Sequence, residues 1–192
     1  WNIALAPLGL YGTLKLRKLA PARIEHVTTR QVHNADGSVD LDVSLTLFAV
    51  EPELIPVELV FDGQRASVNA HLVVGETVIR HRFHVARPKL WWPAGSGEQH
   101  LYSLSLSIPG ETTERRIGLR RIELITDKDE AGNRFAFRVN GREIFCRGAN
   151  WIPADALFSR TSPAKTEALL QSAVDANMNM IRIWGGGFYE HD

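Results

Sequence analysis

The sequence predicts a mainly β fold, in which an antiparallel β-sandwich is followed by a β-hairpin and one βαβ unit. Three observations support this fold class. Apolar and polar residues alternate with a period of two from about residue 22 to residue 126. An Asn-Gly pair then separates two apolar runs. Finally, a single helical pattern lies between two apolar strands.

Four alternating runs predict the sandwich. In the run SVDLDVSLTLF, residues 38–48, every second residue is apolar and the residues between are acidic, hydroxyl-bearing or aromatic. The same period recurs in PVELVFDG, VIRHRFHV and LYSLSLSI, which begin at residues 56, 78 and 101. Such half-buried strands are typical of antiparallel sheets that cover a core with one face. Turn signals separate the runs at Asp36-Gly37, Asp62-Gly63, Val74-Gly75 and Pro109-Gly110. Together these runs predict an immunoglobulin-like sandwich over residues 20–126.

After the polar run TDKDEAGN, residues 126–133, the pattern changes. The stretch RFAFRVNGREIFCRGANW contains two apolar strands around Asn140-Gly141, which predicts a hairpin. The stretch TSPAKTEALLQSAVDANMN predicts a helix, with Ser162 as N-cap, Pro163 in the first turn and Asn177 near the end. Its apolar stripe is expected to pack against the sheet through Leu170, Ala173 and Val174.

A second apolar strand, MIRIW at residues 180–184, follows the helix. A strand near residues 146–151, the helix and this strand make one βαβ unit, which requires a parallel sheet. A closed (β/α)8 barrel needs about 250 residues. We therefore expect residues 127–192 to be the beginning of a truncated barrel domain.

Composition and charge exclude several functions. The 22 basic and 22 acidic residues cancel, and no basic cluster predicts a nucleic-acid partner. No apolar run approaches the ~18–20 residues of a membrane span. Cys146 is the only cysteine, so no disulfide is possible within the chain, and we expect it in the core. The seven histidines have no metal-ligand spacing, so we expect neither a metal nor a cofactor.

The two parallel strands end in unusual sequences, GANWIPAD at residues 148–155 and IWGGGFYE at residues 183–190. In parallel α/β folds, ligands bind at the carboxyl ends of strands. Each end places a tryptophan beside small or polar residues, the combination that suits a sugar, whose C–H faces stack on rings while its hydroxyls form hydrogen bonds. Alternatively, Trp151 and Trp184 close the mouth of the barrel as packing residues.

Several motifs resemble the β-mannosidases of glycoside hydrolase family 2. They are PKLWWPAGSGEQHLYSL, GLRRIEL, FRVNGREIFCRG, GANWIPADALF and ANMNMIRIWGGGFYE, which occur in the family's order over residues 85–192. β-Galactosidases and β-glucuronidases of this family resemble the same layout but carry a Ser-His-Tyr-Pro-like sequence where this chain has WGGG. LGLYGTLKL resembles the last strand of the family's N-terminal jelly roll, which places that strand and a linker at residues 1–19, although Asn2-Ile3 stands where Gly-Pro is expected.

The resemblance implies a retaining glycosidase that removes terminal non-reducing β-D-mannose from a β-mannoside oligosaccharide or glycan. The family's two catalytic glutamates lie on later barrel strands. We therefore assign no catalytic residue in this chain and expect the segment alone to be inactive. The substrate-binding residues that the resemblance implies are Trp184, Asn150, Trp151, Asp155 and Arg182.

Other interpretations remain. Asp155 and Arg182 could form structural salt bridges in the barrel wall. Trp91-Trp92-Pro93 is expected to pack against the barrel instead of contacting sugar. The sandwich could be a free-standing carbohydrate-binding or interaction module, with residues 127–192 as an appended docking segment. The specificity could also be that of a β-galactosidase or β-glucuronidase.

Overall fold

The computed structural model describes residues 9, 14, 16, 22–155 and 157–186, with the side chain of Phe158 left aside. The predictions for residues 1–19 lie almost wholly outside the described residues, as do those for residues 187–190. The chain divides into two compact units. Among the described residues from 22 onward, the sandwich unit contains residues 22–92 and 98–143, and the βαβ unit contains residues 93–97, 144–155 and 157–186.

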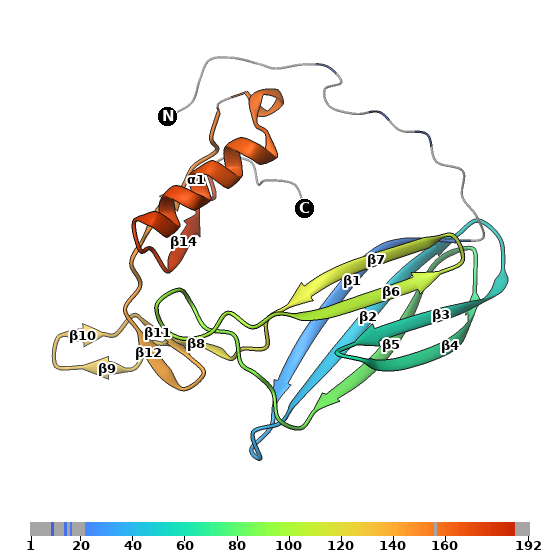
Figure 1. Cartoon of the computed structure of the whole chain (residues 1–192), viewed down its shortest axis with the longest axis horizontal. Helices are drawn as coiled ribbons and strands as arrows, with labels where there is room; N and C mark the ends of the chain where they lie inside the picture. Colours follow the sequence, from blue (N-terminus) through green and yellow to red (C-terminus); the bar gives the residue numbers. More distant parts are fainter. Residues whose placement is uncertain (1–8, 10–13, 15, 17–21, 156, 187–192) are drawn as a thin grey trace. The chain divides into compact units, whose positions relative to one another are not determined.

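Two antiparallel sheets form the sandwich, as the alternating runs predict (Figure 1). One sheet has the order β1-β2-β5 and the other has the order β4-β3-β6-β7. The strands are β1 (Ala22–His33), β2 (Val39–Ala49), β3 (Glu53–Phe61), β4 (Gln64–Leu72), β5 (Gly75–Val85), β6 (Tyr102–Ile108) and β7 (Glu111–Ile117). Crossings between the sheets join the hairpins β1-β2, β3-β4 and β6-β7, and β5 returns to pair with β2, which is consistent with an immunoglobulin-like sandwich.

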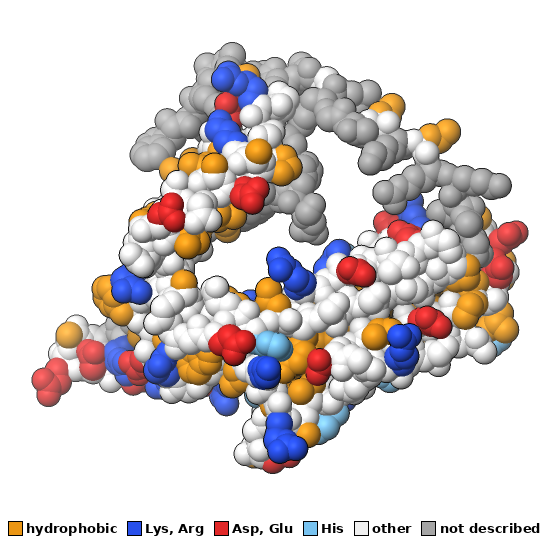
Figure 2. All heavy atoms as spheres, in the orientation of Figure 1, with side chains coloured by type: hydrophobic (Ala, Val, Ile, Leu, Met, Phe, Trp, Pro, Cys, Tyr) orange, Lys and Arg blue, Asp and Glu red, His pale blue; other side chains and the backbone are white. Residues whose placement is uncertain are grey.

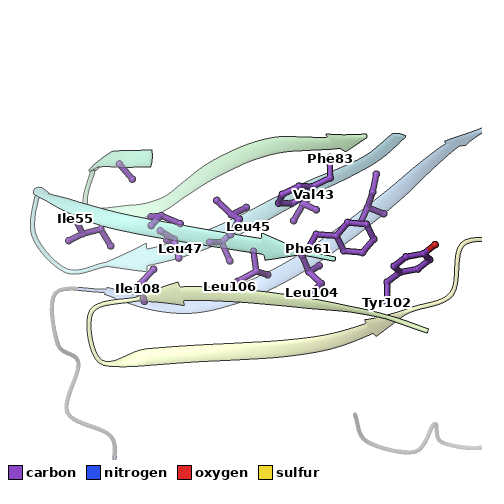
Figure 3. Packing of buried hydrophobic residues seen from close by; sticks show 14 of the residues in the cluster. Val43, Leu45, Leu47, Ile55, Phe61, Phe83, Tyr102, Leu104, Leu106 and Ile108 are labelled. Atoms are coloured by element: carbon purple, nitrogen blue, oxygen red, sulfur yellow. The ribbon is translucent and has the colours of Figure 1, made fainter. Parts of the chain in front are cut away.

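The core lies between these two sheets. Strand β2 alternates strictly between buried and half-buried residues, and β3 and β6 supply the facing apolar side chains. Figure 3 shows Phe61 between Phe83 and Tyr102, with ring centroids 5.5 and 5.4 Å away. Because burial of such side chains is the main favourable term in folding, this unit carries its own stability.

A smaller three-stranded sheet continues the sandwich unit in the order β12-β11-β8. Its strands are β8 (Ile122–Ile125), β11 (Ala136–Val139) and β12 (Arg142–Ile144), and the short ribbon of β9 (Lys128–Asp129) and β10 (Gly132–Asn133) precedes β11. Asn140 and Gly141 both have positive φ, at 50° and 83°, which confirms the predicted hairpin turn.

Trp91 and Trp92 pack against this smaller sheet and the segment that leads to it. The guanidinium of Arg120 lies 4.7 Å from the Trp91 ring, and that of Arg142 lies 4.5 Å from the Trp92 ring. The Asn140 side chain donates a 3.0 Å hydrogen bond to the Trp91 carbonyl. These aromatic side chains therefore have a packing role within the sandwich unit.

The βαβ unit contains β13 (Gly148–Trp151), a 3₁₀ turn at Phe158–Arg160, helix α1 (Pro163–Asp175) and β14 (Met180–Ile183). Strands β13 and β14 pair in parallel, as predicted. The Ser162 side chain accepts a hydrogen bond from the Lys165 N–H, which confirms it as the N-cap, and Asn177 has a φ of 57° just after the helix ends.

The expected packing of α1 is not present. None of its residues is buried, and Leu170 and Val174 are 44% and 59% exposed. Apolar side chains accordingly appear at the surface in the space-filling view (Figure 2). Cys146 lies between β12 and β13 and is half-buried, so its predicted place in the core is wrong.

Candidate sugar site at two strand ends

The candidate site lies where β13 and β14 end. Their register pairs Asn150 with Arg182 and Trp151 with Ile183. Arg182 Nη1 donates a 3.0 Å hydrogen bond to Asn150 Oδ1. The ladder extends one step further, because the N–H of Trp184 donates to the carbonyl of Trp151 at 2.9 Å. Four of the five predicted site residues are therefore brought together by one short parallel pair.

Strand geometry sorts these side chains by face. Because successive residues point to opposite sides, Arg182 and Trp184 share a face with the directly paired Asn150. Trp151 shares the other face with Ile183. The face that carries an amide, a guanidinium and an indole is the one equipped for a polyhydroxylated ligand.

Glycine shapes the surroundings of Trp184. A Cβ placed on Gly186 would lie 2.3 Å from indole Cζ2, so the ring lies directly against the backbone there. A side chain at this position would displace the ring, whereas a Cβ on Gly185 would meet nothing within 4 Å. Gly186 thus leaves the room that the half-buried Trp184 occupies. The run of glycines is therefore explained in part by packing of the tryptophan.

Asp155, the fifth predicted residue, has different contacts. Its Oδ1 accepts a 3.0 Å hydrogen bond from the N–H of Leu157. Its Oδ2 lies 3.2 Å from Arg160 Nε and 3.6 Å from Lys165 Nζ. The Leu157 hydrogen bond, with the charges of Arg160 and Lys165, lowers the pKa of the Asp155 carboxyl. Asp155 thus joins the loop after β13 to the first turn of α1.

Arg160 and Lys165 were missed by the sequence reasoning. Nothing in the local sequence pattern marks them as partners of Asp155. The 3₁₀ turn at Phe158–Arg160 brings Arg160 close to that carboxylate. The ion pairs of Asp155 are of the structural kind given above as the alternative, whereas Arg182 is engaged by an amide and not by a carboxylate.

Neither a metal centre nor a membrane-spanning helix is found among the residues that the structure describes. No group of three or more His, Cys, Asp or Glu side chains could hold an ion there. No helix of that part is long and apolar enough to cross a bilayer. The described carboxylates of the βαβ unit are Asp155, Glu167 and Asp175, and Asp175 accepts a hydrogen bond from Gln171. The described part of the site therefore offers hydrogen-bonding and aromatic groups, but no carboxylate pair for acid and nucleophile chemistry.

An immunoglobulin-like sandwich that leads into a parallel βαβ unit is the arrangement that the resemblance to the glycosidases of family 2 predicts. The family model described as "Glycosyl hydrolases family 2" matches residues 22–120, about half of the chain. The chain belongs to this family.

Among the relatives that resemble this chain in sequence are two named beta-mannosidases. A probable beta-mannosidase of Caenorhabditis elegans is 46% identical over 109 residues, which are 54% of this chain and 12% of the relative. Beta-mannosidase B of Neosartorya fischeri is 41% identical over 207 residues, covering 99% of this chain and 23% of the relative. The chain therefore spans less than a quarter of the length of these relatives.

Solved structures of related glycosidases also resemble this chain in fold. The beta-D-mannosidase of Dictyoglomus thermophilum aligns with a TM-score of 0.82 at 31% identity, over 91% of this chain and 23% of that protein. The exo-chitosanase CsxA of Amycolatopsis orientalis aligns with a TM-score of 0.72 at 21% identity, over 90% of this chain and 21% of that one. At the lower identity the likeness concerns the fold alone. The predicted mainly β architecture and family resemblance are confirmed.

Proposed function

We propose that this chain is a segment of a retaining β-mannosidase and that its strand-end site binds the terminal mannosyl unit of a β-mannoside. The hydrogen bond between Arg182 and Asn150, beside Trp184 on the same face, is the observation that carries the proposal. It is supported by the 41% identity to a beta-mannosidase B over almost the whole chain. The substrate is a β-mannoside oligosaccharide or glycan.

Each residue has a distinct part in this proposal. The Trp184 indole stacks on the C–H face of the sugar, and Asn150 and Arg182 form directional hydrogen bonds with its hydroxyls. Trp151 holds Trp184 through the backbone and limits the other side of the strand pair. Asp155 keeps the loop after β13 in place through its ion pairs, so that Asn150 and Trp151 keep their positions.

The chemical step needs two carboxyl groups about 5–5.5 Å apart, one to protonate the leaving oxygen and one to attack the anomeric carbon. We assign neither role to a residue of this chain. The segment by itself is therefore expected to bind weakly and to turn over no substrate.

The direct experiment assays the full-length protein that carries this segment on the p-nitrophenyl β-glycosides of mannose, galactose and glucuronic acid. We expect turnover of the mannoside alone, and loss of a stacking contact of roughly 0.5–1.5 kcal/mol in Trp184→Ala, measured as a fall in kcat/KM. Trp184→Phe, which keeps an aromatic face, is the matched control and should retain most of the activity. Preferred hydrolysis of either other glycoside would contradict the proposed specificity.

A sandwich module that acts without the barrel is a second candidate, favoured by the separate core of the sandwich unit. It predicts that residues 22–143 bind oligosaccharide as tightly as the full-length protein does. Titration of both proteins with a β-mannoside distinguishes the two candidates.

A further inference from the structure

Asn179 is the last residue before β14, and its side chain contacts the segment that precedes β13. Oδ1 accepts a 2.8 Å hydrogen bond from the backbone N–H of Arg147. Nδ2 donates a 3.0 Å hydrogen bond to the backbone carbonyl of Phe145. A flipped amide would oppose donor to donor and acceptor to acceptor, so the two bonds fix its orientation. The side chain therefore satisfies both ends of its amide on one neighbouring segment.

The backbone at the same position extends this contact. The N–H of Asn179 donates to the carbonyl of Arg147 at 2.8 Å, and the N–H of Met180 reaches the same carbonyl at 3.3 Å. The first ladder pair, Gly148 with Met180, follows directly. Asn179 thus occupies the point at which the parallel ladder begins.

At this point Gly148 allows β13 and β14 to approach each other closely. A Cβ at Gly148 would lie 1.8 Å from the carbonyl oxygen of Met180, a distance that no side chain tolerates. The strands can approach this closely only where glycine faces the Met180 carbonyl, because any other residue there would separate them. The amide of Asn179 and the missing side chain of Gly148 therefore select the same offset between the strands.

The register of β13 and β14 determines which side chains share the face that carries the site. A shift of one residue in a strand turns every side chain to the opposite face. It would separate Arg182 from Asn150, which are now 3.0 Å apart, and would remove the bond from Trp184 to Trp151. A ladder of only four pairs offers few other bonds to oppose such a shift.

We propose that Asn179 is a positioning residue of the sugar site, whose side-chain amide sets the register of β13 and β14 and thereby places Arg182 and Trp184. The inference rests on the proposed function, because the residues that it places are those proposed to bind the mannosyl unit. Within the described chain, the side chain of Asn179 forms hydrogen bonds to backbone atoms only.

Hydrogen exchange in the full-length protein tests the register without any substrate. Asn179→Ala removes both side-chain bonds, and Asn179→Asp keeps the acceptor for Arg147 but loses the donor to Phe145. We expect the amides of Met180–Ile183 to exchange roughly tenfold faster in Asn179→Ala and less fast in Asn179→Asp, with β2 unchanged as internal reference. If Asn179→Ala does not fold, the Asp variant carries the test.

Asn177→Asp is the matched control. It makes the same amide-to-acid change two residues away, at a left-handed position that aspartate tolerates and where the side chain forms no hydrogen bond within the described chain. It should leave the exchange of β14 unchanged. Equal exchange of β14 in wild type and both Asn179 variants would overturn the inference.

Kinetics with p-nitrophenyl β-mannoside separate positioning from plain destabilisation. Misplaced binding groups raise KM, and we expect a several-fold rise for Asn179→Asp, whereas partial unfolding lowers apparent kcat and leaves KM unchanged. A fall in kcat alone would overturn the positioning role. A wild-type protein without mannoside turnover would refute the proposed function, while the exchange data would still decide the register.

Discussion

The two units of this chain both contain hydrogen-bonded strands, seven long ones in the sandwich unit and two of four residues each in the βαβ unit, but they differ in what lies behind the strands. In the sandwich unit, two sheets enclose a continuous apolar core in which Leu45, Leu59 and Leu104 are fully buried. In the βαβ unit, none of the described residues 144–186 is buried. Backbone pairing between strands is present in both units, and the βαβ unit also has a capped helix. Correct local structure and stability therefore have separate origins, since burial of apolar surface supplies most of the stability.

The largest expected effect comes from the same leucine-to-alanine substitution made once in each unit. Leu45→Ala in β2 should lower the free energy of unfolding by about 2–5 kcal/mol, because it empties a fully buried position. Leu170→Ala in α1, where the side chain is 44% exposed, should change it by less than about 0.5 kcal/mol. Urea denaturation of the chain, followed by fluorescence, measures both. Equal losses would mean that α1 is covered in solution.

The next largest effect on stability is expected where the backbones of β13 and β14 approach each other at Gly148. Gly148→Ala would place a Cβ against the Met180 carbonyl, so we expect it to separate β13 from β14 at a cost of about 1–3 kcal/mol. Gly185→Ala is the control, because its Cβ would meet nothing within 4 Å. Hydrogen exchange of Met180–Ile183 in the full-length protein distinguishes them. Unchanged protection in Gly148→Ala would contradict the close approach.

Capping tests the helix itself. Ser162→Ala removes the acceptor for the Lys165 N–H and should cost about 1 kcal/mol of helix stability, seen as lower helical circular dichroism. Ser172→Ala removes only a bond to the Ala168 carbonyl within the helix and should leave or slightly increase helicity. A larger loss from Ser172→Ala than from Ser162→Ala would show that the cap is not formed.

The smallest expected effect is the loss of stability at low pH, to which carboxyl groups of both units contribute. The hydrogen bond from Arg82 lowers the pKa of Asp42 below its ordinary value of 3.8, and Asp155 is lowered likewise in the other unit. A carboxyl with a depressed folded pKa stabilises the fold above about pH 3.8, and that contribution is lost as pH falls through the folded value. Asp42→Asn should therefore flatten the acid limb of a plot of the urea midpoint against pH. An acid limb as steep as in wild type would exclude this pair as a contributor.

Sequence reasoning succeeded where a local pattern is sufficient. Strand β2 was predictable because its five apolar residues from Val39 to Leu47 alternate without a break, and the turn at Asn140-Gly141 because both residues tolerate positive φ. Strand β4, QRASVNAHL, was not predicted individually, because its alternation is weak and its place depends on pairing with β3.

In the candidate site, too, local sequence predicts some features, whereas others depend on residues far apart in the chain. The strand ends with Trp151 and Trp184 were predictable from their position after apolar strands. The bond between Arg182 and Asn150 was not, because 32 residues separate them and their pairing depends on the offset that the loop, α1 and Asn179 allow. The partners of Asp155 were hidden for the same reason, since a 3₁₀ turn brings Arg160 to it.

Hydrogen exchange across the 192-residue chain tests directly whether the sandwich unit alone carries the stability. We expect the amides of β2, β3 and β6 to exchange with the free energy of global unfolding, and those of α1 and β14 to exchange orders of magnitude faster through local opening. Matching protection in β2 and α1 would contradict the claim that the sandwich alone carries the stability of this chain.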